Sequence, residues 1–177
     1  HTATSLAKEL KMSRWGAWKI LKKLEKDSLI LIEPVGHGKT STSMIKLNWG
    51  NILAEKTLAL YLTQEALKYK RWLHDFSSLQ KEIDFLILYG SILYSKEAND
   101  IDILVIVKTN EDFKEVEKIV SEIGFTQIKK IHAIDLTQKE LKFELKKKNK
   151  AYLDALRKGV VLSGQEDFIK FIEEILK

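Results

Sequence analysis

The chain has 177 residues, of which 45% are hydrophobic and 31% are charged, a balance typical of a soluble globular protein and not of a disordered one. It contains no cysteine, which excludes disulfides and thiol chemistry, and its four histidines argue against a structural zinc site. No apolar run approaches the ~20 residues that a membrane helix needs. We therefore expect a cytoplasmic protein without a membrane partner.

The net charge of +5 is unevenly distributed along the chain. Residues 1–48 contain nine lysine or arginine residues against four acidic ones, which by itself accounts for the whole excess. A positive end of this kind predicts a polyanionic partner for the N-terminal part of the chain.

Two short helices and a hairpin are predicted in this N-terminal part. Apolar residues at helical spacing predict one helix over 3–12 and a second that begins after Ser13, which can cap it. Strand-like segments follow at 29–33 and 41–47, and a glycine-containing turn separates them. This order resembles a winged helix-turn-helix, although the usual first helix of that fold would lie before His1.

Basic side chains line the exposed side of the second predicted helix. On a recognition helix, such cations neutralise phosphates or reach into the major groove of double-stranded DNA, and a lysine at the hairpin tip contacts the adjacent backbone or minor groove. The alternatives are a solvated helix face or a winged helix that docks a protein. The predicted DNA-binding residues are Arg14, Lys19, Lys22, Lys23 and Lys39.

Residues 51–82 are predicted to be helical and to connect two domains. The segment is not rich in proline, glycine or serine, so we expect a fairly rigid junction. We predict a winged helix-turn-helix domain over 1–50, a helical connector over 51–80 and a second domain over 81–177. A homodimer through the connector is an alternative, but no heptad pattern supports it.

The second domain alternates between apolar runs of strand length and amphipathic helical stretches. Strands are predicted at 85–89, 101–107, 128–136 and 160–162. Helices are predicted at 111–123, 138–157 and 166–176. We therefore expect a domain in which strands and helices are interleaved along the chain.

One segment of this domain carries a cluster of chemically active residues. The strand predicted at 85–89 ends at Gly90 and Ser91, and a polar loop then leads to Asp100 and Asp102 at the start of the next strand. Residues i and i+2 of a strand point to the same side, so the two carboxylates converge. Because they would repel each other at neutral pH, a cation is expected between them, and Mg²⁺ suits carboxylates that share it with substrate phosphates. Gly90 lets backbone amides approach a phosphate, and Ser91 adds a hydroxyl.

The segment resembles the Gly-Ser…Asp-x-Asp signature of the DNA polymerase beta-like nucleotidyltransferases, in particular their minimal branch. The resemblance implies an α+β fold with a mixed sheet flanked by helices. It also implies transfer of a nucleoside monophosphate from an NTP to an acceptor hydroxyl, with two Mg²⁺ ions and release of pyrophosphate. Gly90 and Ser91 would hold the triphosphate, and Asp100 and Asp102 would ligate the metals, which stabilise both the attacking and the leaving oxygen. The alternative is an ordinary β-hairpin with aspartate caps.

Two features depart from the family pattern. The family commonly has an Arg-Gly pair after Gly-Ser, whereas the loop here begins Ile92-Leu-Tyr-Ser and contains no arginine. A third carboxylate on the next strand usually completes the metal site, and Asp135 is the best-placed candidate; its alternative role is a solvated residue at a strand exit. His132 is interpreted as a packed or surface histidine.

Two functional hypotheses follow. The first is a Mg²⁺-dependent nucleotidyltransferase that uses an NTP, with an acceptor that can be a partner protein, fused to a DNA-binding winged helix. The second is a DNA-binding transcriptional regulator or antitoxin-like protein whose nucleotidyltransferase domain only binds nucleotide. The motif favours the first, and the missing arginine favours the second.

Overall fold

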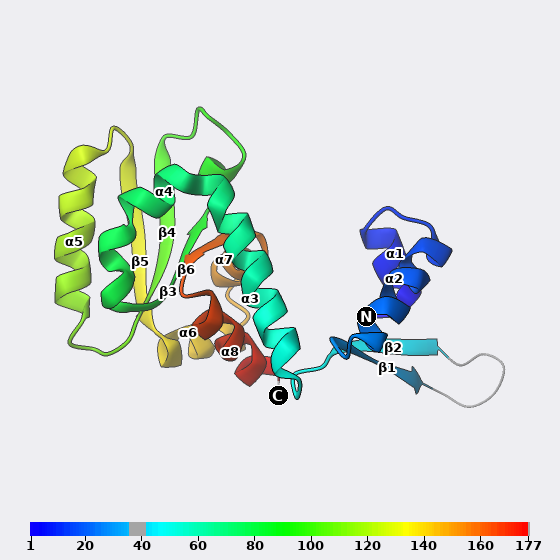
Figure 1. Ribbon diagram of the computed structural model, residues 1–177. Coiled ribbons are helices and arrows are strands. Elements are labelled where there is room, and N and C mark those ends of the chain that lie inside the picture. The colour runs from blue at the N-terminus through cyan, green and yellow to red at the C-terminus, as the bar shows by residue number, and fades with distance from the viewer. Residues whose placement is uncertain (36–41, 177) are drawn as a thin grey trace. The chain divides into compact units, whose positions relative to one another are not determined.

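The computed structural model describes residues 1–35 and 42–176. The chain forms two compact units, His1–Leu58 and Ala59–Lys177, and each is described by itself (Figure 1). None of the helices within the described ranges is long and apolar enough to span a bilayer.

The first unit begins with two helices and a hairpin. Its elements are α1 (Ala3–Glu9), α2 (Arg14–Lys26), β1 (Ile30–Val35) and β2 (Thr42–Leu47), and the two strands pair antiparallel. Leu21, Ile30 and Ile45 form its small buried core. The predicted helices and strands are thus present, while the winged-helix assignment remains a prediction. The hairpin tip, including Lys39, lies outside the described residues.

The helices α1 and α2 begin at side-chain caps. The hydroxyl of Thr2 accepts a hydrogen bond from the backbone amide of Ser5, and the hydroxyl of Ser13 accepts one from the amide of Gly16 at 3.0 Å. These caps satisfy amides that have no partner within the helix. The predicted helix start after Ser13 is confirmed.

Helical segments lead from the first unit into the second. They are α3 (Ile52–Ala66), η1 (Leu67–Tyr69), α4 (Lys70–Asp75) and η2 (Ser77–Lys81). The boundary between the two units falls within α3.

The second unit is built on a four-stranded mixed sheet. Its strands are β3 (Ile83–Tyr89), β4 (Asp100–Val107), β5 (Lys130–Thr137) and β6 (Val160–Ser163), in the order β5-β4-β3-β6. Strand β3 is antiparallel to both of its neighbours, and β4 is parallel to β5. The remaining helices are α5 (Phe113–Thr126), α6 (Gln138–Lys146), α7 (Lys150–Lys158) and α8 (Gln165–Leu176). The predicted mixed sheet flanked by helices is confirmed.

The two faces of this sheet pack against different helices. Successive residues of β4 point to opposite faces, and its odd-numbered apolar residues, from Ile101 to Val107, share a core with Val116 and Ile123 of α5. On the other face, the ring of Phe85 lies 5.4 Å from Phe168 and also from Phe171 in α8. Because Phe85 pairs with Ile106, the even-numbered residues of β4 share this second face.

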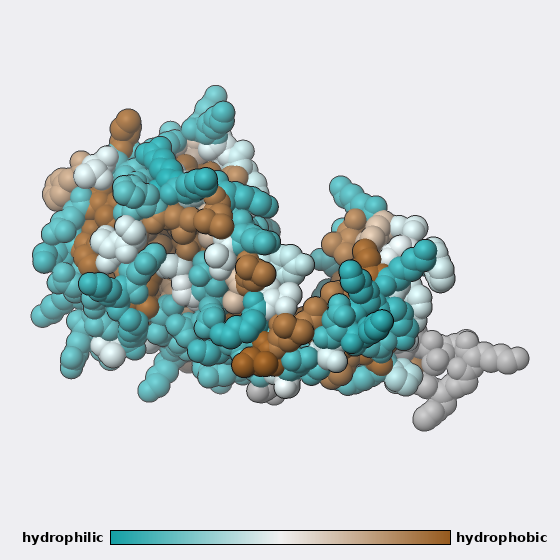
Figure 2. Space-filling model, in the orientation of Figure 1, coloured by the Kyte–Doolittle hydropathy of each residue, from teal (hydrophilic) through white to brown (hydrophobic). Residues whose placement is uncertain are grey.

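The surface visible in Figure 2 is mostly hydrophilic on the larger unit, with hydrophobic residues interspersed among charged ones. Exposed apolar side chains of this scattered kind are normal for a folded protein.

Candidate active site

The turn after β3 needs a glycine. Gly90 has φ +81°, a left-handed conformation that side chains rarely adopt. A β-carbon at this position would lie 2.1 Å from Oδ2 of Asp102. A short 3-10 turn over Ser91–Leu93 follows, and Ser91 itself is exposed. The backbone thus turns directly against the carboxylate of Asp102.

The two aspartates of the motif lie at the start of β4 and on the same face of the sheet. The side chain of Asp100 is 44% exposed and that of Asp102 is 27% exposed. Asp102 pairs with Tyr89 across the antiparallel strands. The structure therefore brings Gly90, Asp100 and Asp102 together at one corner of the sheet, open to solvent.

His132 is a third member of this cluster. It lies in register with Asp102 on the neighbouring parallel strand. Its Nδ1 is 3.5 Å from Oδ1 of Asp102, and its Nε2 is 3.9 Å from Oδ1 of Asp100. This histidine is interpreted from the sequence as packed or at the surface, because its place opposite Asp102 depends on the register between β4 and β5.

Asp135 does not join the cluster, which corrects the expectation that it completes a metal site. It pairs with Val105, a residue of the core shared with α5. Ile131 and Ala133, which lie on the same face of β5 as Asp135, pack against this core. An offset of three residues from His132 places Asp135 on the opposite face of the sheet. Over residues 1–35 and 42–176, no group of three His, Cys, Asp or Glu side chains is arranged to hold a metal ion.

The match to a known family covers this whole region. A model of the family described as polymerase beta, nucleotidyltransferase matches residues 72–163. The chain belongs to this family. The matched range contains all four strands of the sheet and the cluster at Gly90, and it gives nucleotidyl transfer as the general activity. No curated protein and no solved structure matches the chain significantly.

Tyr89 lies beside Asp102 in the nucleotidyltransferase domain. Burial, the charge of Asp102 and the neighbouring Tyr152 of α7 together raise the pKa of Tyr89. Tyr89 therefore keeps its phenolic proton at neutral pH and presents a hydrogen-bond donor or acceptor beside Asp102.

The loop between Gly90 and β4 is held at two points. The hydroxyl of Tyr94 donates a hydrogen bond to the backbone carbonyl of Lys158, at the end of α7, over 3.3 Å. The ammonium of Lys129 donates to the carbonyl of Lys96 at 3.2 Å and also to the carbonyl of Ala98. The loop therefore contacts both α7 and the segment that precedes β5.

The predicted DNA-binding residues within the described ranges lie on the exposed surface of α2: Arg14, Lys19, Lys22 and Lys23. The ammonium of Lys19 lies 5.2 Å from the ring centre of Trp15, and that of Lys22 lies 5.1 Å from the ring centre of Trp18. Lys22 also pairs with Glu25 at 2.7 Å. Salt bridges of exposed side chains are weak, so this helix face remains positively charged.

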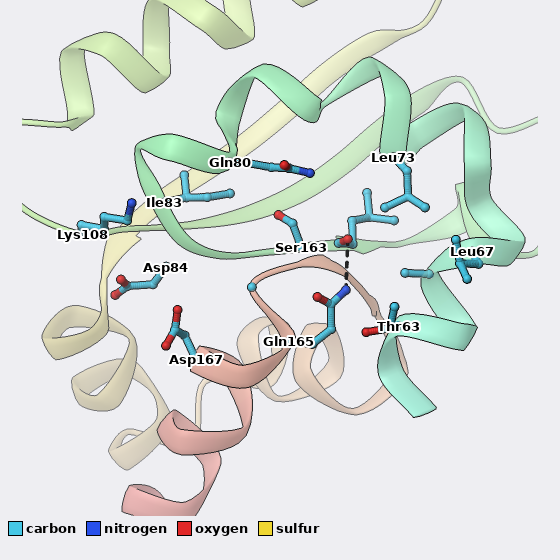
Figure 3. Close-up of a pocket in the computed structure, with 13 residues that line it drawn as sticks. Thr63, Leu67, Leu73, Gln80, Ile83, Asp84, Lys108, Ser163, Gln165 and Asp167 are labelled. Atoms are coloured by element: carbon cyan, nitrogen blue, oxygen red, sulfur yellow. Dashed lines mark hydrogen bonds between the residues drawn. The ribbon is translucent and has the colours of Figure 1, made fainter. Parts of the chain in front are cut away.

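A cavity of about 420 Å³ lies elsewhere in the nucleotidyltransferase domain (Figure 3). Its wall includes Asp84, near the start of β3, whereas Gly90 follows the end of that strand. The carboxylate of Asp84 accepts a hydrogen bond from Gln138 at 2.5 Å, and the buried hydroxyl of Ser163 has no hydrogen-bond partner. The cavity is therefore at the opposite end of the sheet from the carboxylate cluster.

Proposed function

We propose that this chain is a metal-dependent nucleotidyltransferase that moves a nucleoside monophosphate from an NTP to an acceptor hydroxyl. Gly90 and Ser91 bind the triphosphate, and Asp100 and Asp102 hold the metal ion that accompanies it. The observation that carries this proposal is the close approach of Gly90 to Asp102, at the strand end that the family match contains.

The donor set fits a magnesium-bound triphosphate. Asp100 and Asp102 supply hard oxygen ligands on one face of a strand, and both are accessible to solvent. Mg²⁺ is typically held by one or two carboxylates together with substrate phosphates. When bound, it would neutralise charge on the phosphate oxygens. The chain itself supplies the amides of a tight turn and the Ser91 hydroxyl, which orient the triphosphate.

The proposed arrangement also explains why residue 90 is a glycine. Any larger residue there would occupy the space beside Oδ2 of Asp102, where a metal-bound phosphate has to approach. Tyr89 lies next to the same carboxylate and can donate a hydrogen bond to a ligand or to Asp102.

We also propose that the first unit is a winged-helix domain and that it binds double-stranded DNA. The concentration of positive charge in residues 1–48 and the exposed lysines of α2 support this assignment. The corresponding division is a DNA-binding domain over 1–50, a connector over 51–80 and the catalytic domain over 81–177. The enzyme would then act at or near DNA, with the acceptor hydroxyl on a nucleic acid or on a partner protein.

The test of catalysis is incubation of the full chain with each of four α-³²P-labelled NTPs and Mg²⁺, with release of pyrophosphate as a second readout. We expect Asp100→Asn and Asp102→Asn each to abolish both signals. Asp135→Asn is the matched control, because it removes a carboxylate from the opposite face of the same sheet, and it should leave both signals intact. Activity that survives both site substitutions would contradict the proposal.

A second candidate is a regulator that binds nucleotide without transferring it. Two observations favour it. Asp135 lies on the opposite face of the sheet from the carboxylate cluster, and the loop after Ser91 contains no arginine. It predicts Mg²⁺-dependent binding of a fluorescent ATP analogue that Asp102→Asn removes, together with no pyrophosphate release from any NTP. Pyrophosphate release that depends on Asp102 would exclude it.

A further inference from the structure

We infer that the nucleotide site binds one divalent cation and not the two that the family resemblance implies, because His132 occupies the position from which a third carboxylate would reach the second ion. This inference rests on the proposed binding of a metal-nucleotide at Asp100 and Asp102. It changes the expected metal content of the site and leaves the proposed substrate unchanged.

The neighbouring strand determines which groups face the two aspartates. In the parallel pairing of β4 with β5, Asp100 lies opposite Lys130 and Asp102 lies opposite His132. Residues in register on adjacent strands project from the same face of a sheet, so Lys130 and His132 lie on the face that carries the carboxylate pair. The next residue of β5 on this face is Ile134. Strand β5 therefore offers no oxygen ligand here.

The strand on the other side of β4 adds no carboxylate either. Tyr89 of β3 pairs with Asp102, and Tyr152 of α7 is close enough to Tyr89 to influence its pKa. Both side chains end in a phenol and not a carboxylate, and Mg²⁺ is typically held by carboxylates, phosphates and water. Across residues 1–35 and 42–176, Asp100 and Asp102 thus have no third carboxylate within a common metal-binding group.

The ligand count then decides between one ion and two. One Mg²⁺ needs about six oxygen ligands, and two carboxylates, the triphosphate and water molecules supply them. A second ion about 3.5–4 Å away would share the same two carboxylates. The β5 residues on this face, Lys130 and His132, supply no oxygen ligand, and magnesium prefers oxygen to imidazole nitrogen. The second ion is therefore left without a sufficient set of ligands.

His132 lies close to both carboxylates in this arrangement. Its two ring nitrogens lie within 3.5 Å and 3.9 Å of oxygens of Asp102 and Asp100. The imidazole therefore lies beside both carboxylates, on the side from which β5 faces them.

The test counts bound Mn²⁺ by electron paramagnetic resonance on the full chain saturated with α,β-methylene-ATP, an analogue that cannot transfer its nucleoside monophosphate. Mn²⁺ takes the same carboxylate and phosphate ligands as Mg²⁺. We expect one bound ion per nucleotide-loaded chain in the wild type and two in His132→Asp. His132→Asn removes the imidazole without adding a carboxylate, and it should still bind one.

Two ions in the wild type, or only one in a folded His132→Asp variant, would overturn the inference while leaving the proposed function standing. If His132→Asp does not fold, as checked by circular dichroism, the wild-type count alone decides. A different result bears on the proposed function: no nucleotide-dependent Mn²⁺ binding in the wild type, or binding that Asp102→Asn leaves unchanged. The two failures are therefore distinguishable.

Discussion

Gly90 and Asp102 are in such close contact that a β-carbon on residue 90 would lie 2.1 Å from the carboxylate oxygen Oδ2. The two residues come from adjacent antiparallel strands, one just after the end of β3 and the other near the start of β4. Their proximity joins the turn that is proposed to bind phosphate to the carboxylate that is proposed to bind metal. A single methyl group at residue 90 therefore tests both parts of the site at once.

Gly90→Ala should weaken binding of a fluorescent ATP analogue at least tenfold, since the methyl group displaces Asp102. Because φ is +81° at this position, the substitution should also lower the free energy of unfolding by about 1–3 kcal/mol. Urea denaturation measures the second effect. Gly124→Ala in α5 is the control: it has no atom within 4 Å of the added β-carbon, and it should raise stability by up to about 1 kcal/mol. Normal nucleotide affinity in a folded Gly90→Ala variant would contradict the proposed site.

Gly164→Ala should destabilise the protein more than Gly90→Ala does. Its φ is +73°, and the added β-carbon would lie 1.9 Å from the backbone carbonyl oxygen of Asp84 and 2.7 Å from Cα of Phe85. Backbone atoms cannot move aside as a side chain can, so we expect a loss of roughly 3 kcal/mol or more in urea denaturation. Nucleotide affinity of the folded fraction should stay unchanged, since residue 164 borders the cavity at the other end of the sheet (Figure 3). A loss below 1 kcal/mol would show that the turn relaxes.

Lys22→Ala combined with Lys23→Ala should weaken binding to a fluorescently labelled DNA duplex. Each phosphate contact that is lost reduces the slope of log affinity against log salt concentration by about one. Anisotropy titrations at several salt concentrations measure both quantities. The control is Lys114→Ala combined with Lys118→Ala on α5, where Lys118 pairs with Glu115 at 3.4 Å much as Lys22 pairs with Glu25. Equal losses in both double variants would indicate a nonspecific effect of net charge.

The stability of α6 should depend on pH through Glu140. Hydrogen bonds from the backbone amide and the hydroxyl of Thr137 lower the pKa of Glu140 in the folded state. A depressed folded pKa stabilises the protein above the unfolded pKa, and that contribution is lost as pH falls through the folded value. Glu140→Gln should therefore be less stable than the wild type at pH 7, and the difference should shrink in the acid range. Glu117→Gln, on the exposed side of α5, should differ little from the wild type at pH 7, and a pH-independent deficit in Glu140→Gln would refute the linkage.

Local features of the candidate site could be predicted from the sequence because they depend on neighbours in the chain. The strand before Gly90, the turn, and the convergence of Asp100 and Asp102 all follow from short-range spacing. The capping box at Thr137 and Glu140 is also local, because its hydrogen bonds join residues three apart in the chain.

The third group of the site could not be predicted because it depends on the register between two strands separated by α5. His132 and Asp135 are both polar, and they project from opposite faces of the sheet. Which of them faces Asp102 is decided by where β5 begins relative to β4, and a shift of one residue would exchange the two faces. From its charge alone, Asp135 is the better metal ligand of the two. In the structure, however, it is His132 that lies opposite Asp102.

The two anchors of the loop between Gly90 and β4 have a consequence for the strength of nucleotide binding. Tyr94 ties the loop to the end of α7, and Lys129 ties it to the segment before β5. A loop already restricted before its ligand arrives loses little conformational entropy on binding, so more of the interaction free energy appears as affinity. The triphosphate would meet a preorganised surface, and affinity for it would then be sensitive to Tyr94 and Lys129, neither of which has to touch the nucleotide.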